Sequence, residues 1–217
     1  MKKLLLASLG AAFGIFLCSS TYAGPTIGGS TQTTERWKFH PAMHGGYNVL
    51  LEGFDGYDDL GNFGFDLYAD PPEAKKFGSG ATENLLMRIS SDWFPLQVPE
   101  GVNGLKEDIY ALNADCLYRI NVNRDRMLSS WNPFLGFGIG LYQDRISLDT
   151  PATGKVTGTE NYFGVNLSAG VLPPVFSESL PFRLIPEIRY HRIKFESAFV
   201  TSMVYQVGIA YWPGKKQ

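Results

Sequence analysis

The sequence predicts an all-β fold, namely an eight-stranded antiparallel up-and-down transmembrane β-barrel. Three observations lead to this prediction. Apolar and polar residues alternate with a period of two over several segments, which is the side-chain period of a β-strand. Glycine is concentrated on the polar side of those segments. The chain also begins with a segment that has the features of a secretory signal.

The N-terminal segment has the three parts of a cleavable signal. Lys2 and Lys3 are basic, residues 4–17 are apolar, and the segment ends with small residues at Thr21 and Ala23. We therefore expect cleavage after Ala23. The apolar part is shorter than the roughly 20 residues that a membrane-spanning helix needs. The predicted organisation is a signal peptide over residues 1–23, a flexible N-terminal leader over 24–35 and one outer-membrane β-barrel domain over 36–217.

Charge, cysteine content and hydropathy narrow the class of protein further. The chain has 19 Lys and Arg against 21 Asp and Glu, so it lacks the basic excess that is typical of nucleic-acid binding. Signal cleavage removes Cys18 and leaves Cys116 as the only cysteine, which excludes an intramolecular disulfide. No run of 18 apolar residues follows Ala23. Such a chain can cross a membrane only as a closed barrel, because open sheet edges are not satisfied in lipid.

The first three strands are predicted at residues 36–51, 61–69 and 82–94. They place one set of polar side chains on a common face: His40, His44, Asn48, Asp66, Arg88 and Asp92. His40 and His44 lie on the same face of the predicted strand and could be considered as ligands of one metal ion. Four residues along a strand span about 13 Å, so these two side chains cannot bind one ion at its usual ligand distance of about 2.1 Å, and we expect no metal site.

The fourth and fifth strands are predicted at residues 107–121 and 133–148. The fourth has an apolar face opposite a polar one: Tyr110, Leu112, Ala114, Cys116, Tyr118 and Ile120 against Asn113, Asp115, Arg119 and Asn121. The fifth alternates strictly: Leu135, Phe137, Ile139 and Leu141 against Gly136, Gly138, Gly140, Tyr142 and Asp144. A register error of one residue would exchange these faces.

The last three strands are predicted at residues 160–172, 182–193 and 198–212. In the sixth, the two faces are Phe163, Val165, Leu167, Ala169 and Val171 against Tyr162, Gly164, Asn166, Ser168 and Gly170. In the seventh, they are Phe182, Leu184, Ile188 and Tyr190 against Arg183, Glu187, Arg189 and His191. In the eighth, they are Phe199, Met203, Tyr205, Val207, Ile209 and Tyr211 against Ser202, Gln206, Gly208 and Ala210.

The position of the glycines indicates which face meets lipid. In a soluble barrel the polar face is exposed to water and has no need of small residues. In a membrane barrel it lines the lumen, and an eight-stranded lumen is only just wide enough for side chains. The glycines on the polar face are Gly136, Gly138, Gly140, Gly164, Gly170 and Gly208. Aromatic residues near the strand ends on the apolar face fit interfacial girdles: Trp37, Phe39, Trp93, Tyr190, Phe199 and Tyr211.

The C-terminal half resembles the outer-membrane β-barrel domain family, of the small eight-stranded kind typified by OmpA and OmpX barrels. The resemblance covers Asn132 to Trp212 and is carried by Asn132-Pro-Phe-Leu-Gly-Phe-Gly-Ile-Gly-Leu-Tyr, Tyr162-Phe-Gly-Val-Asn-Leu-Ser-Ala-Gly-Val, Ile188-Arg-Tyr-His and Tyr205-Gln-Val-Gly-Ile-Ala-Tyr-Trp. It implies an outer-membrane location in a Gram-negative bacterium, contact with outer-membrane lipid and lipopolysaccharide, and folding by the barrel-assembly machinery. Family members typically end on an aromatic residue that this machinery reads, whereas here Trp212 is followed by five further residues.

The polar face of the strands supplies the only candidate site. Its charged members are expected to form a mutually neutralising network that fills the lumen, because lone buried charges cost several kcal/mol. A pore lining or an anion site is the alternative. The network residues are Arg88, Asp92, Asp115, Arg119, Arg183, Glu187, Arg189 and His191. The acidic run Asp55–Asp59 lacks the spacing of a calcium loop, and we expect no cofactor.

These observations predict a small outer-membrane barrel with a structural, surface-interaction or ligand-binding role and no catalysis. One alternative is a lipid A deacylase, since Arg189-Tyr190-His191 resembles the stretch that carries the catalytic histidine of that family. The family's serine is replaced by Ile193, so the histidine has no hydroxyl beside it to activate. A second alternative is a soluble periplasmic lipocalin-like carrier with an apolar interior.

The connections between the strands are predicted to lie on two sides of the membrane. Connections at 52–60, 95–106 and 149–159 are predicted to be extracellular, and those at 70–81 and 122–132 periplasmic.

Overall fold

The structure is a computed structural model. It describes residues 37–53, 60–71, 84–96, 104–120, 131–150, 154–175, 181–195 and 198–212. The predicted signal peptide, the predicted leader and the acidic run at 55–59 lie outside the described residues. Within the part of the chain that is described, there is no helix that is long and apolar enough to cross a membrane.

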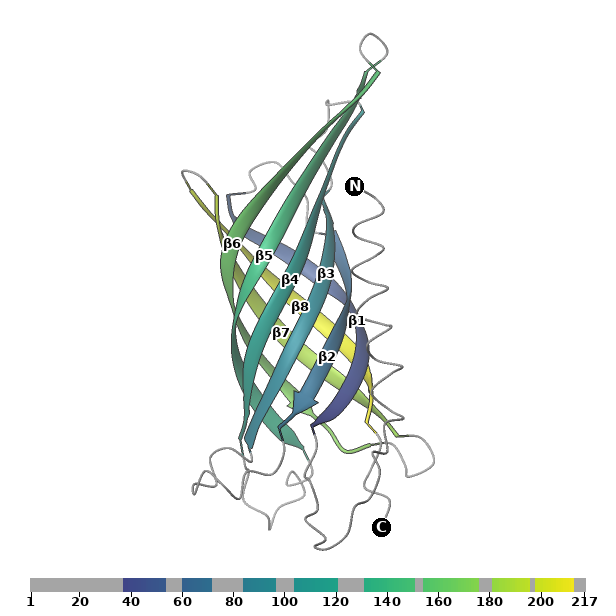
Figure 1. The fold of residues 1–217 in the computed structure, drawn as a ribbon, viewed down its shortest axis with the longest axis vertical. Coiled ribbons are helices and arrows are strands. Elements are labelled where there is room, and N and C mark those ends of the chain that lie inside the picture. The colour runs from purple at the N-terminus through teal and green to yellow at the C-terminus, as the bar shows by residue number, and fades with distance from the viewer. Residues whose placement is uncertain are drawn as a thin grey trace, which may run out of the picture. The chain divides into compact units, whose positions relative to one another are not determined.

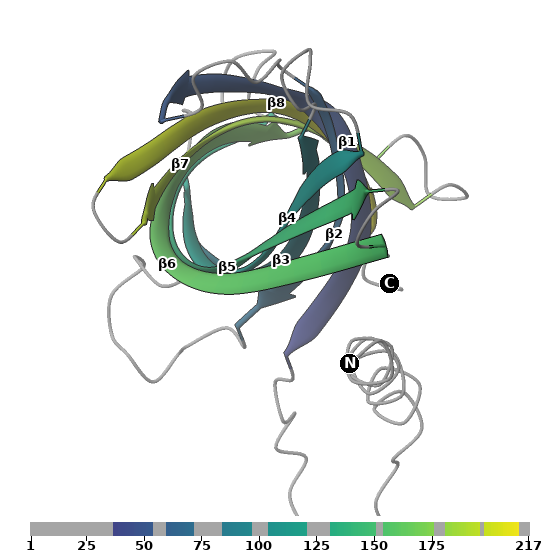
Figure 2. The ribbon, with the colours of Figure 1, turned by 90° about the horizontal axis from the view of Figure 1, so that it is seen from above.

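Eight antiparallel strands form a closed barrel in which each strand pairs with the next along the chain and β8 pairs with β1. Figure 1 shows the strands from the side, and Figure 2 shows the closed ring. The strands are β1 (Lys38–Glu52), β2 (Leu60–Asp70), β3 (Leu85–Leu96), β4 (Leu105–Arg119), β5 (Asn132–Thr150), β6 (Gly154–Leu172), β7 (Phe182–Lys194) and β8 (Phe199–Tyr211). The predicted eight-stranded up-and-down barrel is confirmed.

The β5–β6 hairpin is longer than predicted. β6 begins at Gly154 and not near residue 160, and its pairing with β5 continues to Thr150↔Gly154. The predicted extracellular loop at 149–159 was therefore wrong, because most of it is strand that projects beyond the neighbouring strands in Figure 1. Val156, Thr157 and Thr159 are β-branched and favour a strand. Both faces of this part of β6 are exposed, so no alternation of apolar and polar residues marks it in the sequence.

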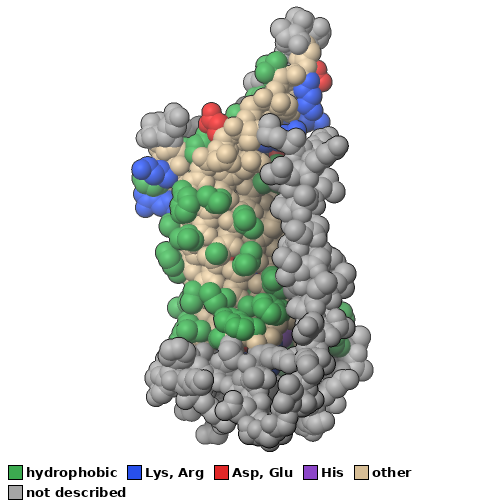
Figure 3. Space-filling model, in the orientation of Figure 1, with side chains coloured by type: hydrophobic (Ala, Val, Ile, Leu, Met, Phe, Trp, Pro, Cys, Tyr) green, Lys and Arg blue, Asp and Glu red, His purple; other side chains and the backbone are tan. Residues whose placement is uncertain are grey.

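The outer surface of the barrel is apolar, as the parity of the strands predicted. Phe137 and Ile139 are 55% and 47% exposed, although they lie in the middle of β5. Figure 3 shows hydrophobic side chains distributed over the outside of the barrel, with charged groups gathered toward one end. A soluble barrel would bury this face. The exterior therefore has the polarity expected of a protein that meets lipid.

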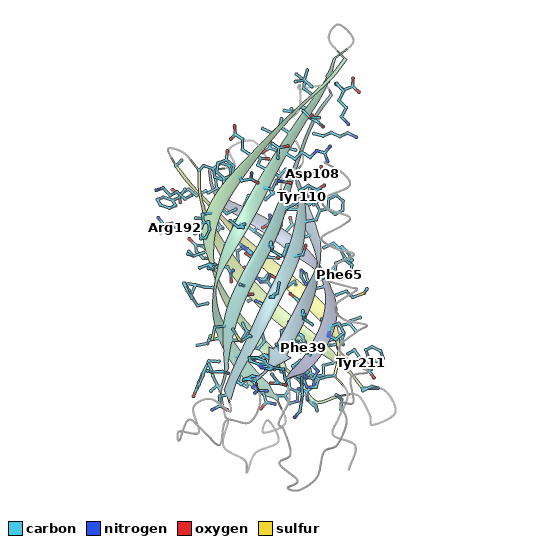
Figure 4. All side chains as sticks on the ribbon, in the orientation of Figure 1. Phe39, Phe65, Asp108, Tyr110, Arg192 and Tyr211 are labelled. Carbon is cyan, nitrogen blue, oxygen red and sulfur yellow. The ribbon has the colours of Figure 1, made fainter. Side chains whose placement is uncertain are left out.

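Aromatic and charged side chains mark the two limits of the apolar surface. Figure 4 shows Phe39 and Tyr211 near one end of the barrel, and Asp108, Tyr110 and Arg192 toward the other. Of the six predicted girdle aromatics, five are highly exposed: Trp37, Phe39, Trp93, Phe199 and Tyr211. Tyr190 is half-buried. The indole of Trp93 donates a hydrogen bond to Asp108 over 3.0 Å, as expected for a ring with one polar end at an interface.

Two apolar layers lie inside the barrel, one near each end. The layer near the start of β1 and the end of β8 comprises Ala42, Tyr68, Leu86, Leu117, Phe134, Leu172, Ile185, Ala210 and Trp212. The layer toward the opposite end comprises Phe94, Leu96, Ile109, Ala111, Tyr142, Ile193 and Val204. Their positions along the strands place the buried charged residues of β3, β4 and β7 between them. The interior is therefore a packed core with a polar middle.

Candidate functional site

The polar middle layer brings together six of the eight residues predicted to form the lumen network. They are Arg88, Asp92, Asp115, Glu187, Arg189 and His191, and each is at most 4% exposed. They meet because alternate residues of every strand point inward, and closure of the barrel sets β7 against β3 and β4 across the lumen. The structure therefore brings six of the residues that parity placed on the polar face into one cluster.

Arg88 on β3 contacts both the adjacent strand β4 and the strand β7 on the far side of the lumen. Its Nε donates to Asp115 Oδ2 on the adjacent β4 over 2.7 Å. Its Nη1 donates to both carboxylate oxygens of Glu187 on β7, over 2.6 and 2.8 Å. Glu187 also accepts a hydrogen bond from the Gln206 amide of β8 over 3.2 Å. One guanidinium thus joins both sides of the lumen.

Arg189 makes a second set of ion pairs beside the first. Its Nη1 lies 3.2 Å from Asp92 Oδ2 and donates to the Ser90 hydroxyl over 3.0 Å. Its Nε lies 3.2 Å from Glu187 Oε1. Because Glu187 contacts both guanidiniums, the two arginine clusters form one connected network.

His44 and Asp66 complete this network, although the predicted set did not include them. Nδ1 of His44 lies 2.8 Å from Asp66 Oδ2, and Nε2 lies 2.8 Å from Asp92 Oδ1. An ionised carboxylate can only accept hydrogen bonds, and both ring nitrogens donate only in the imidazolium form. The geometry therefore fits a positively charged His44. Their inward parity was visible in the sequence, but their mutual contact depends on the barrel register.

The network is close to electrically neutral. Four carboxylates, those of Asp66, Asp92, Asp115 and Glu187, face two guanidiniums and the His44 imidazolium. Each of these seven side chains is at most 1% exposed. Buried charges of this kind are tolerated when they are paired and hydrogen-bonded. The middle of the lumen is therefore a core in which buried side chains of opposite charge form ion pairs.

His191 lies on the side of the network nearer the second apolar layer. Its Nδ1 is 2.8 Å from the Tyr142 hydroxyl, which donates to Asn113 Oδ1 over 3.0 Å. Phe94 packs edge-on against the imidazole. The hydroxyl that contacts His191 therefore belongs to a tyrosine in the lumen and not to a serine. This geometry gives no support to the deacylase alternative, whose substrate would approach from the lipid side.

Arg119 and Arg183 lie apart from the central network, at the end of the barrel where β1 begins and β8 ends. Arg119 Nη1 forms an ion pair with Asp70 over 3.0 Å, and the Arg183 guanidinium lies 4.6 Å from the centre of the Trp212 ring. His40 also stacks on Trp212, with the two ring centres 3.7 Å apart and the rings nearly parallel. The central cluster therefore does not include these two arginines, because each lies about four residues nearer to a strand end than Asp115 or Glu187.

Trp212 itself closes this end of the lumen. It is 8% exposed, and its backbone nitrogen donates to the Pro181 carbonyl over 2.6 Å. The preceding Tyr211 is the aromatic residue that points outward, as Figure 4 shows. The side chain at the end of β8 that faces lipid is thus a tyrosine, and the tryptophan is part of the interior.

Three glycines of the polar face lie where a side chain would collide with the network or with the residues hydrogen-bonded to it. A Cβ atom at Gly138 would lie 1.8 Å from Asp115 Oδ1, and one at Gly140 would lie 2.1 Å from Asn113 Oδ1. A Cβ atom at Gly64 would lie 2.5 Å from His44 Nε2. These glycines therefore provide the space that the polar and charged side chains occupy, as expected for a narrow eight-stranded lumen.

Comparison with solved structures supports the fold. The crystal structure of Neisserial surface protein A (NspA) superposes with a TM-score of 0.54 and 15% identity, over 82% of this chain and 99% of that one. A major outer membrane protein from Thermus thermophilus gives a TM-score of 0.54 and 13% identity, over 81% of this chain and 98% of that one. No protein-family model and no curated protein matches the sequence. The chain has the fold of an eight-stranded outer-membrane β-barrel.

Proposed function

We propose that the protein is an outer-membrane barrel with a closed, non-conducting lumen and that its biological role is a surface interaction at its extracellular end, without catalysis. The observation that carries this proposal is the nearly neutral charged network that lies between two apolar layers. A pore would need a continuous water-filled path, whereas here long side chains from opposite strands meet at the barrel axis.

The direction of the barrel follows from its strand number. With an even number of strands both ends of the barrel domain face the same side, which in bacterial outer-membrane barrels is the periplasm. The extracellular end then contains the projecting β5–β6 hairpin and the connections after β1, β3 and β7. Variable loops on a rigid scaffold are where binding residues concentrate. The interior gives rigidity, and the extracellular end offers the surface for a partner.

The closed lumen is tested by conductance across a planar lipid bilayer. We expect the purified, folded protein to produce no single-channel steps under voltage, while an open porin in the same bilayer conducts. Recovery in the outer-membrane fraction and a band shift between unheated and boiled samples establish location and barrel closure first. Reproducible conductance steps would contradict the closed lumen, and recovery as a soluble periplasmic protein would contradict the location.

A further inference from the structure

The outer face of β7 changes from apolar to cationic at the extracellular rim. Ile188 and Tyr190 belong to the apolar surface, and the next two outward residues are Arg192 and Lys194, both exposed. Figure 4 shows Arg192 on the outside of the barrel toward the same end as Asp108 and Tyr110. The two cations therefore lie where the apolar belt meets the polar head groups of the outer leaflet.

The residues that pair in register with these cations are apolar or neutral. Lys194 pairs in register with Phe163 on β6 and Phe199 on β8, and Arg192 pairs with Val165 and Thr201. The Arg192 guanidinium lies 4.2 Å from the centre of the Phe199 ring. Among the described residues neither cation forms an ion pair. By contrast, the outward-facing Arg145 is opposite Asp108 in the β4–β5 register.

A cleft opens next to Lys194, where β6 continues beyond the end of β7. The last β6–β7 pair is Phe163↔Lys194, and above it β6 is paired with β5 alone among the described strands. The cleft has a volume of about 480 Å³ and is lined by Thr159, Glu160, Asn161, Tyr162, Phe163, Lys194 and Phe195. Glu160 accepts a hydrogen bond from the Tyr162 hydroxyl. The volume lies within the range of small-ligand pockets, which is about 300–1,000 Å³.

We propose that Arg192 and Lys194 bind the phosphate of lipid A, the phosphorylated glycolipid anchor of lipopolysaccharide, with its sugar at the adjacent cleft. The guanidinium offers paired donors and the ammonium a point charge to phosphate oxygens. Asn161 supplies an amide for sugar hydroxyls, and Phe163 and Val165 continue downward as an apolar surface for acyl chains. This proposal rests on the outer-membrane location proposed above, since lipid A belongs to the outer leaflet.

The test is a titration of the folded full-length protein in detergent with diphosphoryl lipid A, read by native mass spectrometry. The double variant R192Q/K194Q is expected to bind lipid A about thirty-fold more weakly, given roughly 1 kcal/mol for each basic residue near an anionic lipid surface. The matched control K106Q/K155Q removes two exposed cations at the same end of the barrel, from β4 and β6. It is expected to bind within about threefold of the unmodified protein.

Two further lipids identify what the cations recognise. Dephosphorylated lipid A is expected to bind the unmodified protein as weakly as lipid A binds the double variant, and phosphatidylglycerol at least tenfold more weakly than lipid A. The proposal is overturned if the double variant retains full affinity, if dephosphorylated lipid A binds equally, or if phosphatidylglycerol binds as tightly. The heat-dependent band shift is measured on the same samples. A chain that does not fold into bilayers contradicts the proposed function, whereas a folded barrel without lipid A selectivity contradicts only this inference.

Discussion

Replacement of Arg189 by methionine is expected to lower the free energy of unfolding by about 3–5 kcal/mol, the cost of leaving buried charges without their partner. Methionine keeps a long unbranched side chain, so the change removes charge and hydrogen bonds more than volume. Asp92 would lose an ion pair at 3.2 Å, and Glu187 would keep Arg88 as its only cationic partner. A marginally stable barrel has little reserve against a loss of this size.

The measurement is urea unfolding of the folded barrel, followed by tryptophan fluorescence. A double variant R189M/D92N is expected to recover roughly half of the loss, because the removal of one negative charge offsets the removal of the positive one. R145M provides the control, since Arg145 is a half-buried rim residue on the outer face of β5 and belongs to no ion pair of the network. Charges near the surface contribute about 0–1 kcal/mol. If R189M unfolds at the same urea concentration as the unmodified protein, the network does not stabilise the barrel.

Addition of a single methyl group at Gly64 is expected to cost about 2–3 kcal/mol, whereas the same change at Gly61 on the same strand should be tolerated. A Cβ atom at Gly64 would lie 2.3 Å from the Ser91 carbonyl oxygen and 2.5 Å from His44 Nε2. The carbonyl belongs to the neighbouring strand β3 and cannot move without disturbing the ladder. At Gly61 the nearest atom would be the Gly46 carbonyl oxygen at 3.5 Å, an ordinary contact.

The comparison of G64A with G61A uses the same unfolding assay. Both variants change glycine to alanine on β2, so differences in backbone entropy largely cancel. We expect the free energy of unfolding of G61A to be within about 0.5 kcal/mol of that of the unmodified protein, or slightly higher. Equal stabilities of the two variants would mean that the lumen has space beside His44. This result would contradict the description of the interior as a packed core.

The alternation of residues was sufficient to predict the strands and the direction of their faces. With a period of two, either the apolar or the polar face of a strand points into the lumen. The glycines on the polar face of β5 and β6 indicated that this face points inward. Arg88, Asp115 and Glu187 were placed in the lumen by the same reasoning. Parity fixes which face a residue occupies, and burial in a narrow barrel then forces opposite charges to meet.

Other features depend on information that one strand does not contain. The contact of His44 with Asp66 and Asp92 requires the register of three strands and the closure of the barrel. The height of a residue along the lumen also depends on strand stagger, so parity alone could not show that Arg119 and Arg183 lie nearer the strand ends than the other residues of the predicted network. The extension of β6 to Gly154 lies outside the apolar belt, where no alternation marks a strand.

In the folded barrel, apolar residues face lipid and the charged network fills the lumen. Thiol labelling in a bilayer tests this orientation of the strand faces most directly. Single cysteines in a Cys116→Ser background are exposed to a lipid-soluble maleimide. Ile139→Cys and Val165→Cys place the thiol on the outer face, and Asn166→Cys and Ser168→Cys place it in the lumen. The native Cys116 is exposed and serves as the positive control. We expect the first two variants to be labelled in the folded barrel and the other two only after unfolding; equal labelling of all four, or labelling of positions 166 and 168 alone, would contradict the account.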